Sequence, residues 1–170
     1  MATAALAAGP GPHAGEPALP ISSSFAGHRT ARRAVEILLG HDPTYRLPTA
    51  AERQALLIGF AQHGKALIGA AYDVVRLAEP LDLTDAVAVA GNISAITICE
   101  VKSTNRAKLK ADLAGYFFNV TAAEQLTAQA LGDRYRFVFV NTLTAEHQEM
   151  SLPQVLGRAR AIYPAWHIRF

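Results

Sequence analysis

Cysteine is almost absent from this chain of 170 residues, because Cys99 is the only one. A single thiol excludes an intrachain disulfide framework and a zinc site built from cysteines. The six histidines are scattered without the spacing of metal ligands, so a histidine metal site is not expected. The lack of a disulfide framework favours a reducing compartment, and we expect a cytoplasmic protein.

Long apolar runs and a strong net charge are also missing. No run approaches the roughly 18 to 20 apolar residues of a membrane helix, so no membrane association is expected. The net charge is only +2, which permits a nucleic-acid partner without indicating one. The chain is nevertheless 51% hydrophobic and 18% charged, the balance of a protein with a globular core.

The N-terminal part is predicted to be a tail followed by helices. Alanine, glycine and proline dominate residues 1–20, which predicts a disordered tail without a phosphate-binding glycine loop. Residues 21–79 are expected to form a helical segment that packs on the rest of the chain. Its first helix ends at Gly40. Its second helix, over residues 49–78, opens with a capping box of Thr49 and Glu52.

After Pro80 the apolar residues recur with the period of strands. Strands are expected over 85–90, 93–102, 115–120, 134–143 and 165–170, and helices over 121–131 and 151–163. The first two strands would form a hairpin around Gly91-Asn92. Residues 80–170 are therefore predicted to be an α/β core with a mixed central sheet flanked by helices.

The stretch ITICEVKSTN, residues 96–105, is an apolar strand that ends in an acid and a base. Glu100 and Lys102 share one face of this strand, because side chains alternate along it. If the predicted hairpin has its simplest register, Asp85 faces Ile98 and is the diagonal neighbour of Glu100. Such neighbours lie roughly 7 to 8 Å apart, close enough to bind one ion. The hairpin would then present two carboxylates and an ammonium together.

Two converging carboxylates suit Mg²⁺ or Mn²⁺, which prefer oxygen ligands. A metal ion held by Asp85 and Glu100 would activate a water molecule, and Lys102 would orient that water and stabilise the transition state. This chemistry predicts phosphodiester hydrolysis, with Asp85, Glu100 and Lys102 as catalytic residues. The plainer alternative is a solvated strand edge, which is the commoner origin of a Glu-x-Lys pair.

Other polar residues near this strand are candidates for contacts with a substrate. The candidate nucleic-acid-binding residues are Ser103, Thr104, Arg106, Lys108 and Lys110. A solvated charge run and a simple strand end are the alternatives for these positions. Gln125 is a candidate for supporting the site, Asp82 is a rival to Asp85, and Glu124 is expected to cap the helix over 121–131.

Two sequence motifs resemble a known group of nucleases. Asp85 followed by Glu100-Val101-Lys102-Ser103-Thr104 resembles the PD-(D/E)xK nuclease superfamily. The stretch ICEVKST, with the later FFNVTAAEQLTAQALGDRYRFVFVNT, is similar to the plant NO VEIN-type C-terminal domain. The resemblance covers residues 80–145. It implies a restriction-endonuclease-like αβββαβ core, metal ligands at Asp85 and Glu100, and a catalytic lysine at Lys102.

We therefore expect a Mg²⁺- or Mn²⁺-dependent endonuclease that hydrolyses DNA. By analogy, its setting would be defence, restriction or mobile-element biology, with a homodimer or a partner protein left open. The alternative is an inactive nuclease-fold module that binds nucleic acid or a protein partner.

Overall fold

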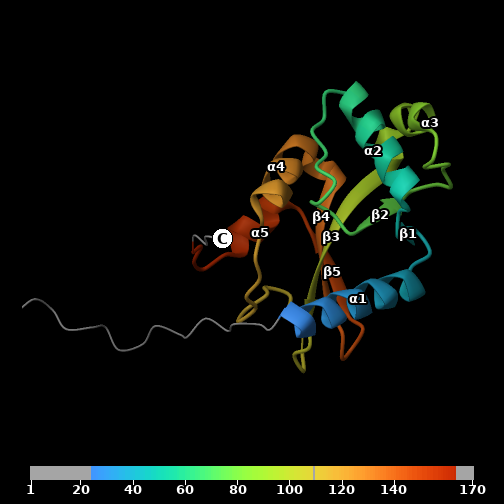
Figure 1. Ribbon diagram of the computed structural model, residues 1–170. Helices are drawn as coiled ribbons and strands as arrows, with labels where there is room; N and C mark the ends of the chain where they lie inside the picture. Colours follow the sequence, from blue (N-terminus) through green and yellow to red (C-terminus); the bar gives the residue numbers. More distant parts are fainter. Residues whose placement is uncertain (1–23, 109, 164–170) are drawn as a thin grey trace, which may run out of the picture.

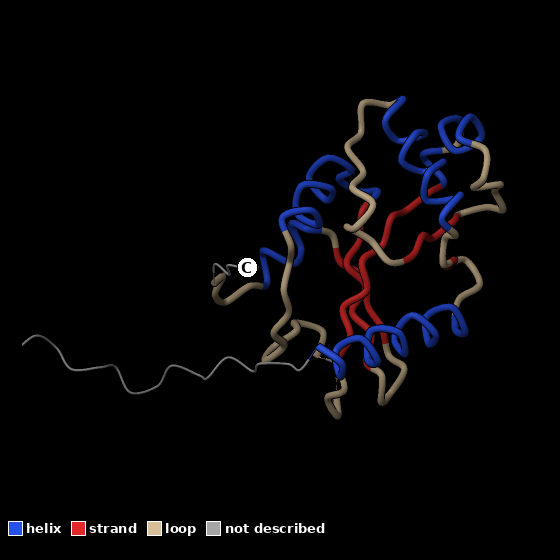
Figure 2. The backbone as a smooth tube through the Cα atoms, in the orientation of Figure 1, coloured by secondary structure: helices blue, strands red, loops and turns tan. Residues whose placement is uncertain are grey.

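The computed structural model describes residues 24–108 and 110–163, which form a five-stranded mixed sheet with helices on both faces (Figures 1 and 2). The helices are α1 (Ser24–His41), α2 (Ala50–Gln62), α3 (Ala86–Gly91), α4 (Ala122–Leu131) and α5 (Leu152–Arg158). The strands are β1 (Tyr45–Arg46), β2 (Val74–Leu77), β3 (Ile96–Thr104), β4 (Tyr135–Asn141) and β5 (His147–Met150). The predicted tail over 1–20 and the predicted strand over 165–170 lie outside the described residues.

The strands lie in the sheet in chain order, β1 to β5. β1, β2 and β3 pair antiparallel, β4 runs parallel to β3, and β5 is antiparallel to β4. A parallel neighbour requires a crossover connection, and α4 lies within it between β3 and β4. The expectation of an α/β fold with a mixed sheet flanked by helices is confirmed. No helix among the described residues is both long and apolar enough to cross a bilayer.

The sheet buries a separate hydrophobic core on each face. Phe60 of α2 and Leu131 of α4 pack on one face with Ile98 and Phe137, a side of the sheet seen between the upper helices in Figure 2. α1 packs on the other face through Ala34, Leu38 and their neighbours. Cys99 is fully buried in this second core, as expected for a small core residue facing away from Glu100.

The predicted helix over 49–78 is wrong in its second half. α2 stops at Gln62, and Gly64 takes a positive φ of 65° just after it, a conformation that glycine adopts at little cost. The chain then turns back and Val74–Leu77 forms β2, where β-branched side chains fit a buried strand. Residues 21–79 thus supply two strands of the central sheet rather than a separate helical segment.

The predicted hairpin around Gly91-Asn92 is also wrong. Residues 86–91 form α3, and Asp85 is its N-cap, with its Oδ1 accepting a hydrogen bond from the Val87 amide at 2.8 Å. Ile98 pairs with Val75 of β2, so no strand beginning at Asp85 lies beside β3. The run AVAVA alternates in apparent strand fashion, but an aspartate before small residues is also a helix start.

Residues 115–120, predicted as a strand, form no regular element. Tyr116 and Phe118 instead pack on Phe139 of β4, with ring centroids 5.8 and 4.9 Å away. β5 was not predicted from the sequence. The predicted helix over 121–131 and the predicted strand over 134–143 are confirmed as α4 and β4, and the helix over 151–163 is confirmed in part as α5.

We predict that Gly59→Ala lowers the free energy of unfolding by roughly 1–3 kcal/mol, because α2 and α3 touch there. A Cβ atom at Gly59 would lie 2.4 Å from Val89 Cγ1 and 3.1 Å from the Ala90 nitrogen. Gly40→Ala in α1 is the control, since its Cβ would meet nothing within 4 Å. It should be neutral or stabilising by up to ~1 kcal/mol. Equal effects in urea denaturation would contradict the close contact.

Candidate functional site

Lys102 lies between two carboxylates on the face of the sheet that α4 covers. Its Nζ atom is 2.9 Å from Glu100 Oε1 and 2.7 Å from Glu124 Oε2. The Lys102, Glu100 and Glu124 side chains are only 12%, 13% and 6% exposed. β3 places Glu100 and Lys102 on one face by simple alternation. The shared face predicted from the sequence is therefore confirmed.

Glu124 reaches this cluster because of how α4 begins. Thr121 caps the helix and forms a capping box with Glu124, in which each side chain accepts the other's backbone N–H. The predicted cap is thus confirmed, but the same carboxylate also accepts from Lys102. The first turn of α4 is fixed over the end of β3 by this shared contact.

Asp73 is the acid that the structure places beside Glu100. It precedes β2, whose first residue Val74 pairs with Cys99, so continuing this pairing by one residue sets Asp73 opposite Glu100. Asp73 Oδ2 accepts the Val101 amide at 2.9 Å, which closes the strand pair after the backbone ladder ends. Its Oδ1 atom accepts no hydrogen bond from the described residues. One oxygen therefore fixes the carboxylate and leaves the other available.

Two side chains hold the segment that leads to Asp73. Arg53 of α2 donates to the carbonyls of Tyr72 and Asp73 at 3.2 and 2.9 Å, and its guanidinium lies 4.5 Å from the centre of the Tyr72 ring. Tyr135 of β4 donates its hydroxyl to the carbonyl of Ala71. Because backbone carbonyls at 71–73 are satisfied from both neighbouring elements, the position of Asp73 is well determined.

The electrostatics of this cluster centre on Glu100. Burial raises the pKa of its carboxyl to about 7, against the favourable charge of Lys102 and with further upward effects from Asp73 and Glu124. Burial also raises the pKa of the neighbouring Tyr135 hydroxyl, with Glu100 among its causes. Two carboxylates thus hold the ammonium of Lys102, and a third, that of Asp73, adds negative charge beside Glu100. An added cation would relieve the repulsion between Asp73 and Glu100.

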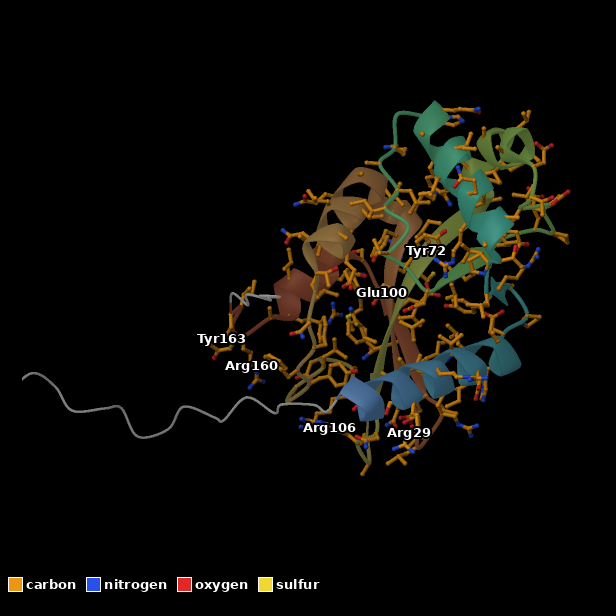
Figure 3. All side chains as sticks on the ribbon, in the orientation of Figure 1. Arg29, Tyr72, Glu100, Arg106, Arg160 and Tyr163 are labelled. Atoms are coloured by element: carbon orange, nitrogen blue, oxygen red, sulfur yellow. The ribbon has the colours of Figure 1, made fainter. Side chains whose placement is uncertain are left out.

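Asp85 and Asp82, the acids predicted for the site, lie elsewhere. Asp85 is exposed and caps α3. Asp82 is exposed too, and its Oδ1 accepts from both the amide and the hydroxyl of Thr84, which lowers the pKa of its carboxyl. Neither is a strand neighbour of Glu100, so the geometric reason for choosing Asp85 is removed. Figure 3 labels Glu100 within the body of the molecule.

The other predicted contact residues flank the site to different degrees. Ser103 and Thr104 continue β3, and their carbonyls accept from Tyr116 and from Thr142. Arg106, Lys108 and Lys110 are exposed in the loop that follows. Gln125 is exposed on the first turn of α4, and the residue before it, Glu124, faces the cluster instead.

The described residues contain no group of three or more histidine, cysteine, aspartate or glutamate side chains arranged to hold a metal ion. Glu124 accepts from both Lys102 and Thr121. Among the described residues, Glu100 accepts from Lys102 through Oε1 only and Asp73 from Val101 through Oδ2 only, so Asp73 and Glu100 each keep one oxygen available. Two carboxylates with waters are a donor set that Mg²⁺ accepts. Two half-buried acids at opposite strand positions, each raising the electrostatic cost of the other's charge, therefore fit a hard divalent cation.

Two cavities of the described structure lie away from this cluster. One of about 310 Å³ lies between α1 and the turn after β4, and one of about 530 Å³ lies beside the loop over residues 78–82. None of the four cluster residues lines either cavity. The site is thus described by its polar cluster at the sheet face and not by either of these cavities.

Comparison with known proteins found no match, whether among protein-family models, curated proteins or solved structures. The chemistry of this cluster therefore rests on its own residues.

Asp73 and Glu124 are the two cluster residues that sequence reasoning missed as site residues. A signal for Asp73 was present, since an acid directly before a Val-Val pair and after Gly64 and Gly69 is compatible with the start of a strand. Glu124 gave a clear capping signal, but its contact with Lys102 spans 22 residues of chain and has no local signature.

We predict that Glu100→Gln stabilises the metal-free protein at pH 8. The Glu100 pKa is about 7 in the folded protein and 4.5 without its surroundings, so the unfolded state loses this proton first as the pH rises. The free energy of unfolding should therefore fall by up to ~3 kcal/mol between about pH 4.5 and 7, and should stay level at higher pH. The variant should lack this fall, as measured by urea denaturation in EDTA.

Glu36→Gln is the matched control, because Glu36 forms an exposed pair with Arg32 on α1. It should change stability by less than ~0.5 kcal/mol at either pH. A Glu100→Gln protein that is less stable than wild type at pH 8 would contradict the electrostatic account.

Proposed function

We propose that this protein is a metal-dependent nuclease that hydrolyses DNA phosphodiester bonds, with Asp73 and Glu100 as metal ligands. The observation that supports this most directly is the position of Asp73, which lies opposite Glu100 in the strand register, raises the pKa of Glu100, and has one carboxylate oxygen fixed by the Val101 amide. The ammonium of Lys102, hydrogen-bonded to Glu100, would supply a positive charge at the same site. Asp73 here replaces Asp85, whose side chain caps a helix.

The order of elements is consistent with this proposal. α1 is followed by the antiparallel strands β1, β2 and β3, then by α4 and the parallel strand β4. With α2 and α3 taken as insertions between strands, this is the αβββαβ order that the resemblance implies. β2 and β3 are then the central pair, and the candidate residues come from the end of one and the second half of the other.

The chain's own residues would divide the chemistry among them. A divalent cation at this site supplies charge neutralisation at the phosphate and a more acidic bound water. Asp73 and Glu100 would hold it with hard oxygen donors. Lys102, fixed by two carboxylates, would donate a hydrogen bond and place a positive charge beside the phosphate oxygens or the attacking water.

Glu124 would act as a positioning residue. It contacts Lys102 at 2.7 Å and lies almost fully buried at the start of α4. If Glu100 bound a cation, Glu124 would remain as the partner that keeps Lys102 in place. Asp73 and Glu100 would then be the metal ligands, and Glu124 would hold the lysine.

A second candidate function is an inactive nuclease-fold module that binds nucleic acid or a protein. The observation that favours it is the pairing of Lys102, whose single positive charge is already offset by two acids. Under this alternative, the acids and the lysine neutralise one another as a buried structural network, and DNA is bound without being cut.

We predict that the purified protein cuts supercoiled and linear DNA with Mg²⁺ or Mn²⁺, and that Asp73→Asn reduces the rate at least about 100-fold. An asparagine oxygen can still accept the Val101 amide, so the variant should fold while losing the ligand charge. Lys102→Gln should slow cutting by about the same factor, because it removes the positive charge.

Asp85→Asn is the matched control, since asparagine caps helices as well as aspartate does. It should cut like wild type. Loss of cutting in Asp85→Asn but not in Asp73→Asn, with both proteins folded by circular dichroism, would overturn the assignment of Asp73. Binding of DNA by a wild-type protein that never cuts would favour the inactive module.

A further inference from the structure

Phe117 is an exposed aromatic side chain in the loop between β3 and α4. It is 52% exposed, whereas its neighbours Tyr116 and Phe118 turn inward and pack on each other and on Phe139. The inward rings hold the backbone on both sides of Phe117. Because the backbone at Phe117 is already fixed, stacking of a flat partner on its ring would order few additional groups and would lose little conformational entropy.

This loop is attached at both ends to the catalytic cluster. It leaves β3 after Thr104, two residues beyond Lys102, and enters α4 through Thr121, which caps the turn containing Glu124. Between these points, Tyr116 donates its hydroxyl to the carbonyl of Ser103. Phe139, beneath the inward rings, pairs with Lys102 across the parallel strands. The backbone that carries Phe117 is therefore anchored, through Tyr116 and Phe118, on the strand partner of Lys102.

The same loop has a net positive charge, with three basic residues against one acid, Asp112, whose Oδ1 accepts the Ala114 amide. Arg106, Lys108 and Lys110 are exposed, and no ion pair joins them to an acid in the part of the chain that the structure describes. The Arg106 guanidinium lies against Gly115, where an added Cβ would be 3.0 Å from Nη1. Gly115 has a φ of 76°, which favours glycine. Figure 3 labels Arg106 at the edge below Glu100.

From these features we infer that residues 105–108 and 110–121 of this loop bind single-stranded nucleic acid, with a base stacked on Phe117. Arg106, Lys108 and Lys110 contact the phosphates that follow. The proposal rests on the proposed function and deepens it, because it names a single-stranded segment as the part of the DNA that this loop would hold. The chemical recognition itself does not depend on cleavage.

An exposed phenylalanine distinguishes single strands from duplexes. Every base of a single strand offers a free face for stacking, whereas a duplex has already stacked its bases on one another. The phosphates of a duplex would pair with the basic residues equally well. A duplex has no free base face for Phe117, however, so this ring would stay exposed to water. The pairing of one displayed ring with a basic stretch therefore favours a single strand over a duplex.

The test is fluorescence anisotropy with a labelled oligothymidylate and a labelled duplex, in EDTA so that nothing is cut. The oligothymidylate should bind more tightly than the duplex. Phe117→Ala should weaken its binding roughly 5- to 150-fold, as for other stacking residues. Phe117→Trp should keep the affinity, and its fluorescence should be quenched on binding. Equal binding of an oligouridylate supports the same stacking site.

Two variants provide matched controls. Val87→Ala removes an apolar side chain that is 73% exposed on α3, and Lys65→Glu reverses an exposed charge in the loop after α2. Both should bind like wild type, whereas Lys108→Glu should weaken binding and flatten its salt dependence.

Wild-type affinity in Phe117→Ala, or a preference of the wild type for duplex, would overturn the single-strand proposal. Because no metal is present, these outcomes are independent of whether the protein cuts DNA. If Phe117→Ala loses binding and the wild type does not cut DNA, the single-strand site is supported and only the proposed nuclease activity is contradicted.

Discussion

The ammonium of Lys102, held between Glu100 and Glu124, is the interaction on which the rest of the site depends. It joins the middle of the sheet to the first turn of α4, and so fixes the end of the loop that precedes that helix. Buried charges are costly unless each is paired, and removing Lys102, the one cation that both acids share, would leave both unpaired, a loss that typically costs about 3–5 kcal/mol. The cluster is therefore a demanding arrangement for a protein to maintain for structural reasons alone.

Asp73 adds a third carboxylate to this cluster, and its additional negative charge favours the binding of a cation. With Asp73 present the acids outnumber the nearby cation, and burial together with the charges of Asp73 and Glu124 raises the pKa of Glu100 to about 7 even though Lys102 lowers it. A purely structural ion pair gains nothing from an additional acid. A site that binds a divalent cation does, because the surplus negative charge is what the cation neutralises.

The sequence predicted those features that depend on local patterns. Alternation along β3 placed Glu100 and Lys102 on one face whatever the register, and the capping box defined the start of α4. The predictions failed where a strand's partner had to be chosen, because AVAVA suits a strand or a helix equally and nothing local favours β2 as the neighbour of β3. Asp73 was consequently hidden within a predicted helix, and Asp85 was taken in its place.

Titration of the wild-type protein with Mn²⁺, followed by electron paramagnetic resonance, tests the central claim most directly. The account predicts saturable binding that is lost in both Asp73→Asn and Glu100→Gln, is retained in Asp85→Asn, and strengthens as the pH rises through about 7, where Glu100 loses its proton. Binding that survives in Asp73→Asn, or no saturable binding by the folded wild type at pH 8, would contradict it.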